Sequence, residues 1–204
     1  MDQPLPAAGH APERIASGPW RERLRALPVF PAGLPDFEPD AAPDDPLHLA
    51  EAWLTTAIEA GVLQPHAANL STVDSSGAPS TRTLLLKDLT SEGFWFATPS
   101  DSPAGRDLAH EPRASLHLYW PQLGRQLRIT GPATPGPAEV TAADWAARSP
   151  QARAEANEAT WTAYLLRPTA IEFFAASPTR SHQRLRYDRD DVLAGTWSRA
   201  RLAP

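Results

Sequence analysis

The sequence predicts a mainly β protein, an antiparallel barrel with a few helices attached to it. Several short segments with strand-like composition recur along the chain, and turn signals built from Gly, Pro, Asp and Ser separate them at regular spacing. The length of 204 residues is enough for one domain with a sizeable core. The chain contains no cysteine, which excludes a disulfide scaffold, a thiol nucleophile and a cysteine-ligated metal centre.

Charge and hydropathy narrow the class of protein further. The chain carries 24 acidic and 19 basic residues, a net charge of −5, which argues against a general nucleic-acid binder. No apolar stretch is long enough to span a bilayer, and the N-terminus lacks the basic and apolar regions of a signal peptide. We therefore expect a cytoplasmic protein with no nucleic-acid or membrane partner.

Residues 1–44 are expected to form a proline-rich arm, and residues 45–204 the folded domain. Ten of the 23 prolines fall within residues 1–46, too many for a continuous helix, and the start of the arm is expected to be disordered. Apolar side chains in the middle of the arm are candidates for docking it onto the body: Trp20, Leu24, Leu27, Val29 and Phe30.

The helices and strands of the domain follow from capping residues and periodicity. The first helix is predicted from Asp45 as N-cap, with Pro46 at the first helical position, to a stop at Gly61. Three more helices are expected over residues 102–110, from about residue 141, and over residues 149–159. Strands are expected over residues 68–73, 80–87, 93–98, 113–120, 125–134, 170–175, 184–189 and 196–202.

Three segments place polar side chains on predicted strands. In residues 82–87, Arg82 and Lys87 bracket an apolar run and lie on opposite faces; they bind an anion or simply cap the strand at its solvent ends. Gln126 either hydrogen-bonds the polar edge of a ligand or lies on an exposed strand face. Arg180, His182 and Arg184 share one side of an extended segment, a cationic row suited to a phosphate or carboxylate, although a single His is more often structural.

Other catalytic signatures are missing from the sequence. It contains no glycine-rich phosphate loop, no His-x-x-x-His metal pair and no Gly-x-Ser-x-Gly elbow. The residues by themselves therefore indicate an anion-binding antiparallel barrel and nothing more specific.

The order and spacing of several short motifs give a family. From about residue 45 to its end, the chain resembles the pyridoxamine 5′-phosphate oxidase family. The motifs that carry the resemblance are Asp45-Pro46, residues 82–87, residues 94–98, Glu111-Pro112-Arg113, Arg125-Gln126, residues 171–174, residues 180–184 and residues 201–204.

The resemblance implies a split β-barrel homodimer that holds FMN between its subunits, takes a hydride from a small-molecule substrate and reduces O2. The FMN site that it implies comprises Arg82, Thr83, Leu84, Leu85, Lys87, Ala97, Thr98, Ser102, Gln126, Phe174 and Arg184, with Arg106 as a possible substitute for a missing cation. The substrate positions that it implies are Lys87, Trp145, Ser149, Arg153, Arg180 and His182, of which Arg180 and His182 are the catalytic pair.

The sequence also departs from the family pattern. Pro103-Ala104 stands where the family commonly places basic residues, and Phe174 stands where it usually has Trp. Trp145, Ser149 and Arg153 replace the usual Tyr, Arg and Ser. These departures predict a substrate diverged toward a secondary metabolite; the alternative is a cofactor-poor or non-catalytic barrel that binds a ligand without redox turnover.

Overall fold

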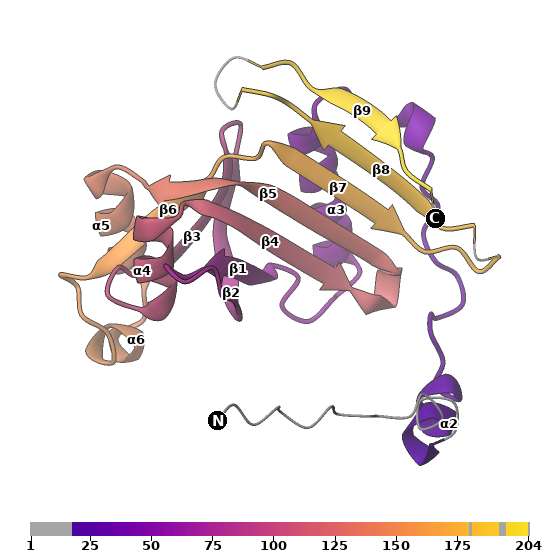
Figure 1. The fold of residues 1–204 in the computed structure, drawn as a ribbon, viewed down its shortest axis with the longest axis horizontal. Helices are drawn as coiled ribbons and strands as arrows, with labels where there is room; N and C mark the ends of the chain where they lie inside the picture. Colours follow the sequence, from indigo (N-terminus) through magenta and orange to yellow (C-terminus); the bar gives the residue numbers. More distant parts are fainter. Residues whose placement is uncertain (1–17, 180, 192–194, 204) are drawn as a thin grey trace, which may run out of the picture.

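The computed structural model describes residues 18–179, 181–191 and 195–203. Within these ranges nine strands form one antiparallel sheet in the order β4-β1-β2-β3-β6-β5-β7-β8-β9, with an additional β4–β5 pairing. That pairing closes the first six strands of this order into a barrel, and β7, β8 and β9 extend the sheet beyond β5 (Figure 1). The predicted mainly β barrel is confirmed.

The barrel strands are β1 (Ala67–Val73), β2 (Pro79–Thr90), β3 (Gly93–Pro99), β4 (Arg113–Trp120), β5 (Arg125–Pro135) and β6 (Trp161–Leu166). The extension consists of β7 (Ala170–Ala175), β8 (Gln183–Asp188) and β9 (Ser198–Arg201). Strand β6 has no counterpart in the sequence prediction, yet it joins β3 to β5 in the barrel by pairing with both. Gly131 allows β5 to pass close to the chain after β6, since a Cβ there would lie 2.0 Å from the Arg167 carbonyl oxygen.

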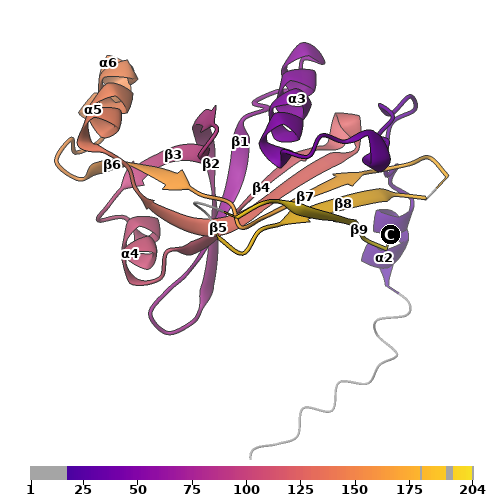
Figure 2. The ribbon, with the colours of Figure 1, turned by 90° about the horizontal axis from the view of Figure 1, so that it is seen from above.

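Helix α3 (Pro46–Glu59) covers one face of the extended sheet, as Figure 2 shows. It begins as predicted, because the Asp45 carboxylate accepts the Leu47 amide N–H at 2.9 Å. Trp53 of α3 is 3% exposed and meets the ring of Phe173 in β7 edge-on, with ring centroids 5.1 Å apart. This contact packs α3 against the sheet and leaves the opposite face of β7 and β8 uncovered by it.

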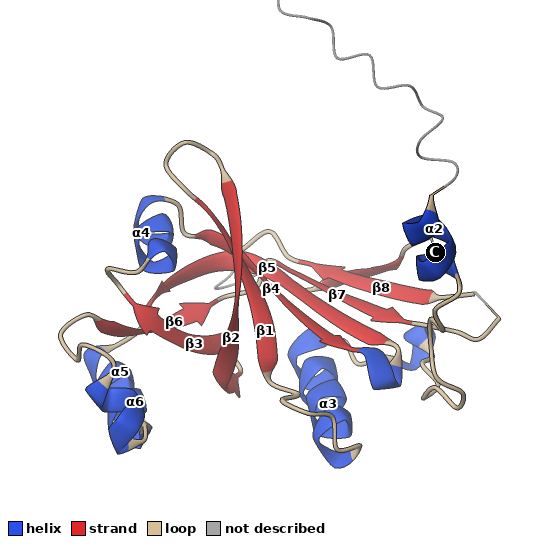
Figure 3. Ribbon diagram, turned by 90° about the horizontal axis from the view of Figure 1, so that it is seen from below, coloured by secondary structure: helices blue, strands red, loops and turns tan. Residues whose placement is uncertain are grey.

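Three further helices flank the barrel strands: α4 (Pro103–His110), α5 (Ala138–Ala147) and α6 (Pro150–Ala154). Figure 3 shows all three toward the end of the molecule that lies farthest from β8. Helix α5 begins three residues before the predicted start, and α6 stops well short of residue 159. Within the rest of the range predicted as helix the chain turns at Asn157, whose side-chain oxygen accepts the Ala159 N–H at 3.0 Å.

The arm differs from its prediction. Seven residues form a helix, α2 (Pro19–Arg25), because the only proline in it is at the first position, where a proline is tolerated. Trp20, Leu24, Leu27 and Val29 are 59–73% exposed, so the expected docking of these four side chains onto the body of this chain is wrong. The fifth predicted docking residue, Phe30, does contact the body, at His182. The arm also meets the body further along, where Phe37 packs against Trp53 and the Asp36 carbonyl accepts a hydrogen bond from Arg125. The predicted disordered start falls in residues 1–17, outside the described ranges.

In the described residues no helix has the length and apolar character needed to cross a membrane. Two short 3₁₀ turns complete the chain, at Pro39–Ala41 and Pro121–Leu123.

Candidate functional site

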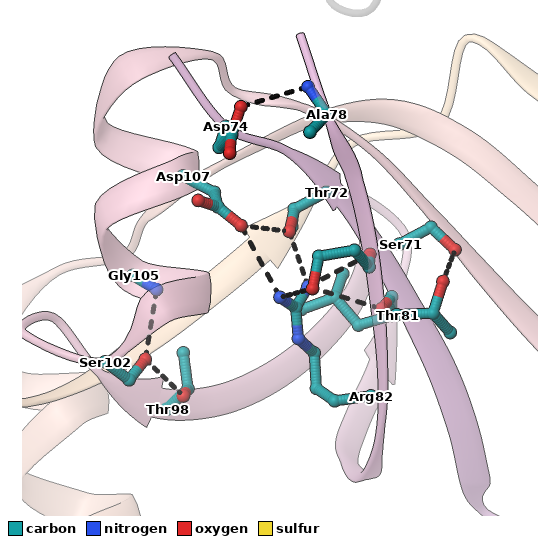
Figure 4. Close-up of polar contacts among 12 residues, drawn as sticks. Ser71, Thr72, Asp74, Ala78, Thr81, Arg82, Thr98, Ser102, Gly105 and Asp107 are labelled. Atoms are coloured by element: carbon teal, nitrogen blue, oxygen red, sulfur yellow. Dashed lines mark hydrogen bonds and ion pairs between the residues drawn. The ribbon is translucent and has the colours of Figure 1, made fainter. Parts of the chain in front are cut away.

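Arg82, the first of the predicted cofactor residues, is held by side chains from β1 and α4 (Figure 4). Its guanidinium donates to the Thr72 hydroxyl, and lies 3.5 Å from the carboxylate of Asp107. Thr72 in turn donates to Asp107 at 2.6 Å, which closes a three-membered network in a mostly buried place. Arg82 therefore has a fixed position, and part of its charge is already balanced by Asp107.

Thr98 and Ser102, two of the predicted cofactor residues, meet at the start of α4. Their hydroxyl oxygens are 3.2 Å apart, and Ser102 caps α4 by accepting the Gly105 N–H at 3.0 Å. Arg106 donates to the Asp101 carbonyl oxygen, which keeps its guanidinium beside this first turn. Pro103 has no N–H, and the Gly105 N–H is used by the cap. The Ala104 N–H and the two hydroxyls are therefore the groups of the helix start that can bind an anion.

The departure at Pro103-Ala104 has a clear structural form. Pro103 is exposed at the first position of α4, whereas Ala104 is only 5% exposed and packs into the core. A long basic side chain fits at the first position and not at the second, so the two residues are not equivalent sites for a restored cation.

A second group of predicted residues lies on β5, β7 and β8. Gln126 pairs directly with Phe174, and Phe174 pairs directly with Arg184. Directly opposed residues of neighbouring strands share one face of a sheet. The structure therefore brings these three residues into one row, on the face that α3 does not cover.

Two residues that the sequence analysis missed fix this row. The buried carboxylate of Glu172 accepts two hydrogen bonds from Arg184, at 3.1 and 2.7 Å, and also pairs with Arg128 at 2.9 Å. His117 Nε2 lies 3.3 Å from Gln126 Oε1; because that oxygen can only accept, Nε2 carries the hydrogen. The Gln126 amide nitrogen is then the group that can donate to a ligand.

His182 lies beside the row and is oriented by the backbone. Its Nδ1 accepts the Ser177 N–H at 3.1 Å, so the neutral ring carries its hydrogen on Nε2. The ring centroid is 5.3 Å from that of Phe174 and 5.8 Å from that of Phe30 in the arm. Arg180, the other half of the predicted catalytic pair, falls outside the described residues.

The predicted substrate positions on α5 and α6 are only partly together. Lys87 Nζ is 3.7 Å from the Asp144 carboxylate on α5, next to Trp145. The Ser149 hydroxyl is used to cap α6, where it accepts the Ala152 N–H at 3.2 Å, and Arg153 is exposed in the last turn of that helix. Lys87 and Trp145 are linked through Trp161, whose indole N–H donates to Asp144 and whose ring centroid is 6.2 Å from that of Trp145.

The remaining predicted cofactor residues lie on β2 and β3 with different surroundings. The Thr83 hydroxyl donates to Asn69 at 2.8 Å, Leu84 packs partly against the core, Leu85 is 39% exposed, and Ala97 is buried. Leu84 and Leu86 face inward while Thr83 and Leu85 face outward, which agrees with the period-two alternation expected from the sequence.

A hollow of about 450 Å³ on the uncovered face of the sheet contains part of the row. Gln126, Phe174, Glu172 and His117 line it from β5, β7 and β4, and Thr81 lines it from β2. By contrast, α5 and the end of β7 that leads into β8 lie at opposite ends of the horizontal axis in Figures 1 and 3. Within one chain, Lys87 with its partner Asp144 on α5 therefore lies far from His182, which follows β7.

Comparison with known proteins shows the family to which the chain belongs. Residues 54–182 match the family described as Pyridoxamine 5'-phosphate oxidase, and residues 161–204 match the Pyridoxine 5'-phosphate oxidase C-terminal dimerisation region. The chain belongs to the pyridoxamine 5′-phosphate oxidase family. In this family's terms, β6 through β9 are the segment that matches the dimerisation region, and they carry Phe174, His182 and Arg184.

Individual relatives of this pyridoxamine 5′-phosphate oxidase family member span most of its length. The Pyridoxine/pyridoxamine 5'-phosphate oxidase of Salinibacter ruber is 36% identical over 200 residues, covering 81% of this chain and 92% of the relative. The enzyme of the same name from Pseudomonas paraeruginosa is 36% identical over 197 residues, covering 80% and 90%.

Solved structures agree on the fold. PhzG from Burkholderia lata 383, in complex with tetrahydrophenazine-1-carboxylic acid, superposes with a TM-score of 0.77 at 31% identity and covers 85% of this chain and 100% of that one. A pyridoxamine 5'-phosphate oxidase-related, FMN binding protein from Nostoc punctiforme has a TM-score of 0.68 at 19% identity, covering 78% and 98%, which supports the fold alone.

Proposed function

We propose that this protein is an FMN-dependent oxidase that works as a homodimer, with each flavin site made from both chains. The observation that carries the proposal is the division of the site residues within one chain. Lys87, paired with Asp144 on α5, lies toward one end of the chain's long axis. His182 lies near the other end, beside the row that Gln126, Phe174 and Arg184 form on β5, β7 and β8. A two-fold symmetric partner is the simplest way to bring one such group next to the other.

The side chains present fit a flavin mononucleotide. The start of α4 offers the Ala104 N–H and the hydroxyls of Thr98 and Ser102 for a phosphate, with Arg82 close by. The row offers an amide donor on Gln126 and an aromatic ring on Phe174, groups suited to the polar edge and the face of a planar ring system. When bound, FMN would accept a hydride from the substrate and pass the two electrons to O2, giving hydrogen peroxide.

The chain's own residues would then orient the substrate. His182, with its Nε2–H available for donation and its Nδ1 fixed by the Ser177 amide, is placed to hydrogen-bond a substrate heteroatom near the row. Lys87 and Trp145 would contact the same substrate from the other chain. We further propose that this substrate has diverged from a vitamin B6 phosphate, because Ser149 is engaged in capping α6 and Arg153 is exposed at its far end.

An FMN titration followed by an oxidation assay tests the proposal. The protein should quench the fluorescence of added FMN and gain thermal stability from it. Light scattering should show a dimer, and turnover should release hydrogen peroxide. FAD should bind less well, because its adenylate would extend past a phosphate seated at the start of α4. No quenching and no thermal shift with FMN would overturn the oxidase and favour the non-catalytic ligand-binding barrel.

A further inference from the structure

Lys87 is the only lysine in the chain, and the structure gives it a carboxylate partner. Its Nζ is 3.7 Å from Asp144 Oδ1, and its side chain is 34% exposed. The pairing of β2 with β3 shifts register between Leu86 and Asp88, so Lys87 occupies an irregularity in the strand. Such bulges redirect a side chain, here toward α5.

Asp144 is itself held in place from a second side. Its Oδ2 accepts the Trp161 indole N–H at 2.8 Å, and the carboxylate side chain is only 13% exposed. Helix α5 is tied to β6 nearby, since the Thr141 hydroxyl accepts the Ala163 N–H at 3.0 Å. The negative charge is therefore fixed beside Lys87 and is not on a freely rotating surface side chain.

Arg148, which follows Trp145 at the end of α5, contacts aromatic rings. The Arg148 guanidinium lies 3.9 Å from the ring centroid of Trp161 and 5.6 Å from that of Trp145, and it donates to the Ala152 carbonyl at 2.7 Å. These contacts direct the guanidinium to the rings and the α6 backbone. The surface around Lys87 thus combines a neutralised ion pair with indole rings.

We propose that Asp144 is a specificity-determining residue that cancels the charge of Lys87 and so selects a planar aromatic substrate without a phosphate group. The inference rests on the proposed function, in which Lys87 faces substrate. A phosphate monoester carries close to two negative charges and would meet the Asp144 carboxylate as well as the lysine. An uncharged ring system meets no such repulsion and gains contact with Trp145.

The test compares Asp144→Asn with a matched control, Glu139→Gln. Asparagine keeps an oxygen that can accept the Trp161 N–H and removes only the charge. Glu139 lies on the same helix and is exposed, so its replacement makes the same change in net charge away from Lys87. Each FMN-loaded protein is titrated by calorimetry with pyridoxine 5′-phosphate and with pyridoxine, which differ only in the phosphate.

Asp144→Asn should tighten the binding of pyridoxine 5′-phosphate by about tenfold. A carboxylate within roughly 6 Å of a dianion weakens its binding by that factor even in water-like surroundings. The affinity for pyridoxine should change by less than about twofold, because pyridoxine carries no phosphate charge for Asp144 to repel. Glu139→Gln should change neither. Adding Lys87→Met to Asp144→Asn should abolish the gain.

Two results overturn the role of Asp144: unchanged affinity of Asp144→Asn for the phosphate ester, or equal tightening of both compounds. Strong preference of the unaltered protein for pyridoxine 5′-phosphate over pyridoxine also overturns it. FMN quenching measured on the same preparations separates this from the proposed function. If none of the proteins binds FMN, the proposed oxidase function is wrong. If they bind FMN but Asp144→Asn has an unchanged affinity for the phosphate ester, only the inference about Asp144 is wrong.

Discussion

Restoring a cation at the start of α4 should strengthen FMN binding at one position and damage the fold at the next. Pro103 is exposed at the first helical position, so Pro103→Lys places an ammonium beside the helix N-terminus without burying it. Ala104 is 5% exposed in the core, so Ala104→Lys buries the same charge. Arg82 and Arg106 already have partners in Asp107 and the Asp101 carbonyl, which leaves room for an added cation to contribute.

The size of the effect follows from the balance of two contributions. A charge-assisted hydrogen bond to the phosphate contributes about 1.5–3 kcal/mol. Ordering the lysine side chain costs up to about 2 kcal/mol. A net gain of about 1 kcal/mol corresponds to roughly fivefold tighter FMN binding for Pro103→Lys. Loss of the proline lowers the stability of the FMN-free protein by about 0.4–1 kcal/mol, roughly 1–4 °C in Tm.

Fluorescence quenching of FMN at two salt concentrations measures the gain, and differential scanning fluorimetry measures the stability. The gain should shrink at the higher salt concentration, because screening weakens an exposed charge contact. Ala104→Lys should instead lower Tm of the FMN-free protein by about 10 °C or more, since an unpaired buried ammonium costs several kcal/mol. An FMN affinity of Pro103→Lys within twofold of the unaltered protein would refute a phosphate position at the start of α4.

Three further variants test the packing and the electrostatics. Trp53→Ala should destabilise the fold by about 3–5 kcal/mol, seen in urea unfolding, because the ring is buried against Phe173; a loss under about 1 kcal/mol would contradict that packing. Glu172→Gln should cost about 1.5–3 kcal/mol and weaken FMN binding by releasing Arg184, and unchanged affinity would disprove the positioning role. The Arg113 guanidinium holds the pKa of Glu111 to about 2, so this carboxylate stabilises the fold above its unfolded pKa and loses that contribution as pH falls toward 2. Arg113→Ala should raise the Glu111 pKa in an NMR titration, and no rise would show another cause.

The sequence predicted the elements whose signals are local. Asp45-Pro46 marks a helix start by capping chemistry, and most of the predicted strands appear with small shifts at their ends. The prediction missed strand β6, Trp161–Leu166, because it extended the preceding helix to residue 159, past the Asn157 turn and almost to the start of the strand. The β-prone residues Trp161, Thr162 and Tyr164 were the available sign.

The candidate site was only partly predictable, for a physical reason. Residues such as Gln126 and Arg184 are recognisable by type and motif, but their shared row depends on the register of three strands. The acidic residues that pair with the cations of the site are harder to recognise in the sequence. Asp107, Asp144 and Glu172 come from other elements, and only the folded chain brings each of them next to its cation. The prediction for the arm was wrong because a local signal was present without the contact. The apolar side chains of Trp20 and Leu24 indicated docking that this chain does not make with itself.

A heterodimer of two defective chains tests most directly whether the flavin site is shared. Chains carrying Arg82→Gln and chains carrying Arg184→Gln are co-expressed with different tags, and the heterodimer is isolated and titrated with FMN. If each site takes one arginine from each chain, both defects fall in one site and the other is intact, so about one FMN binds per heterodimer with unaltered affinity. Neither homodimer should show that affinity. A heterodimer without any site of unaltered affinity would contradict the account, because it would place both arginines of each site in the same chain.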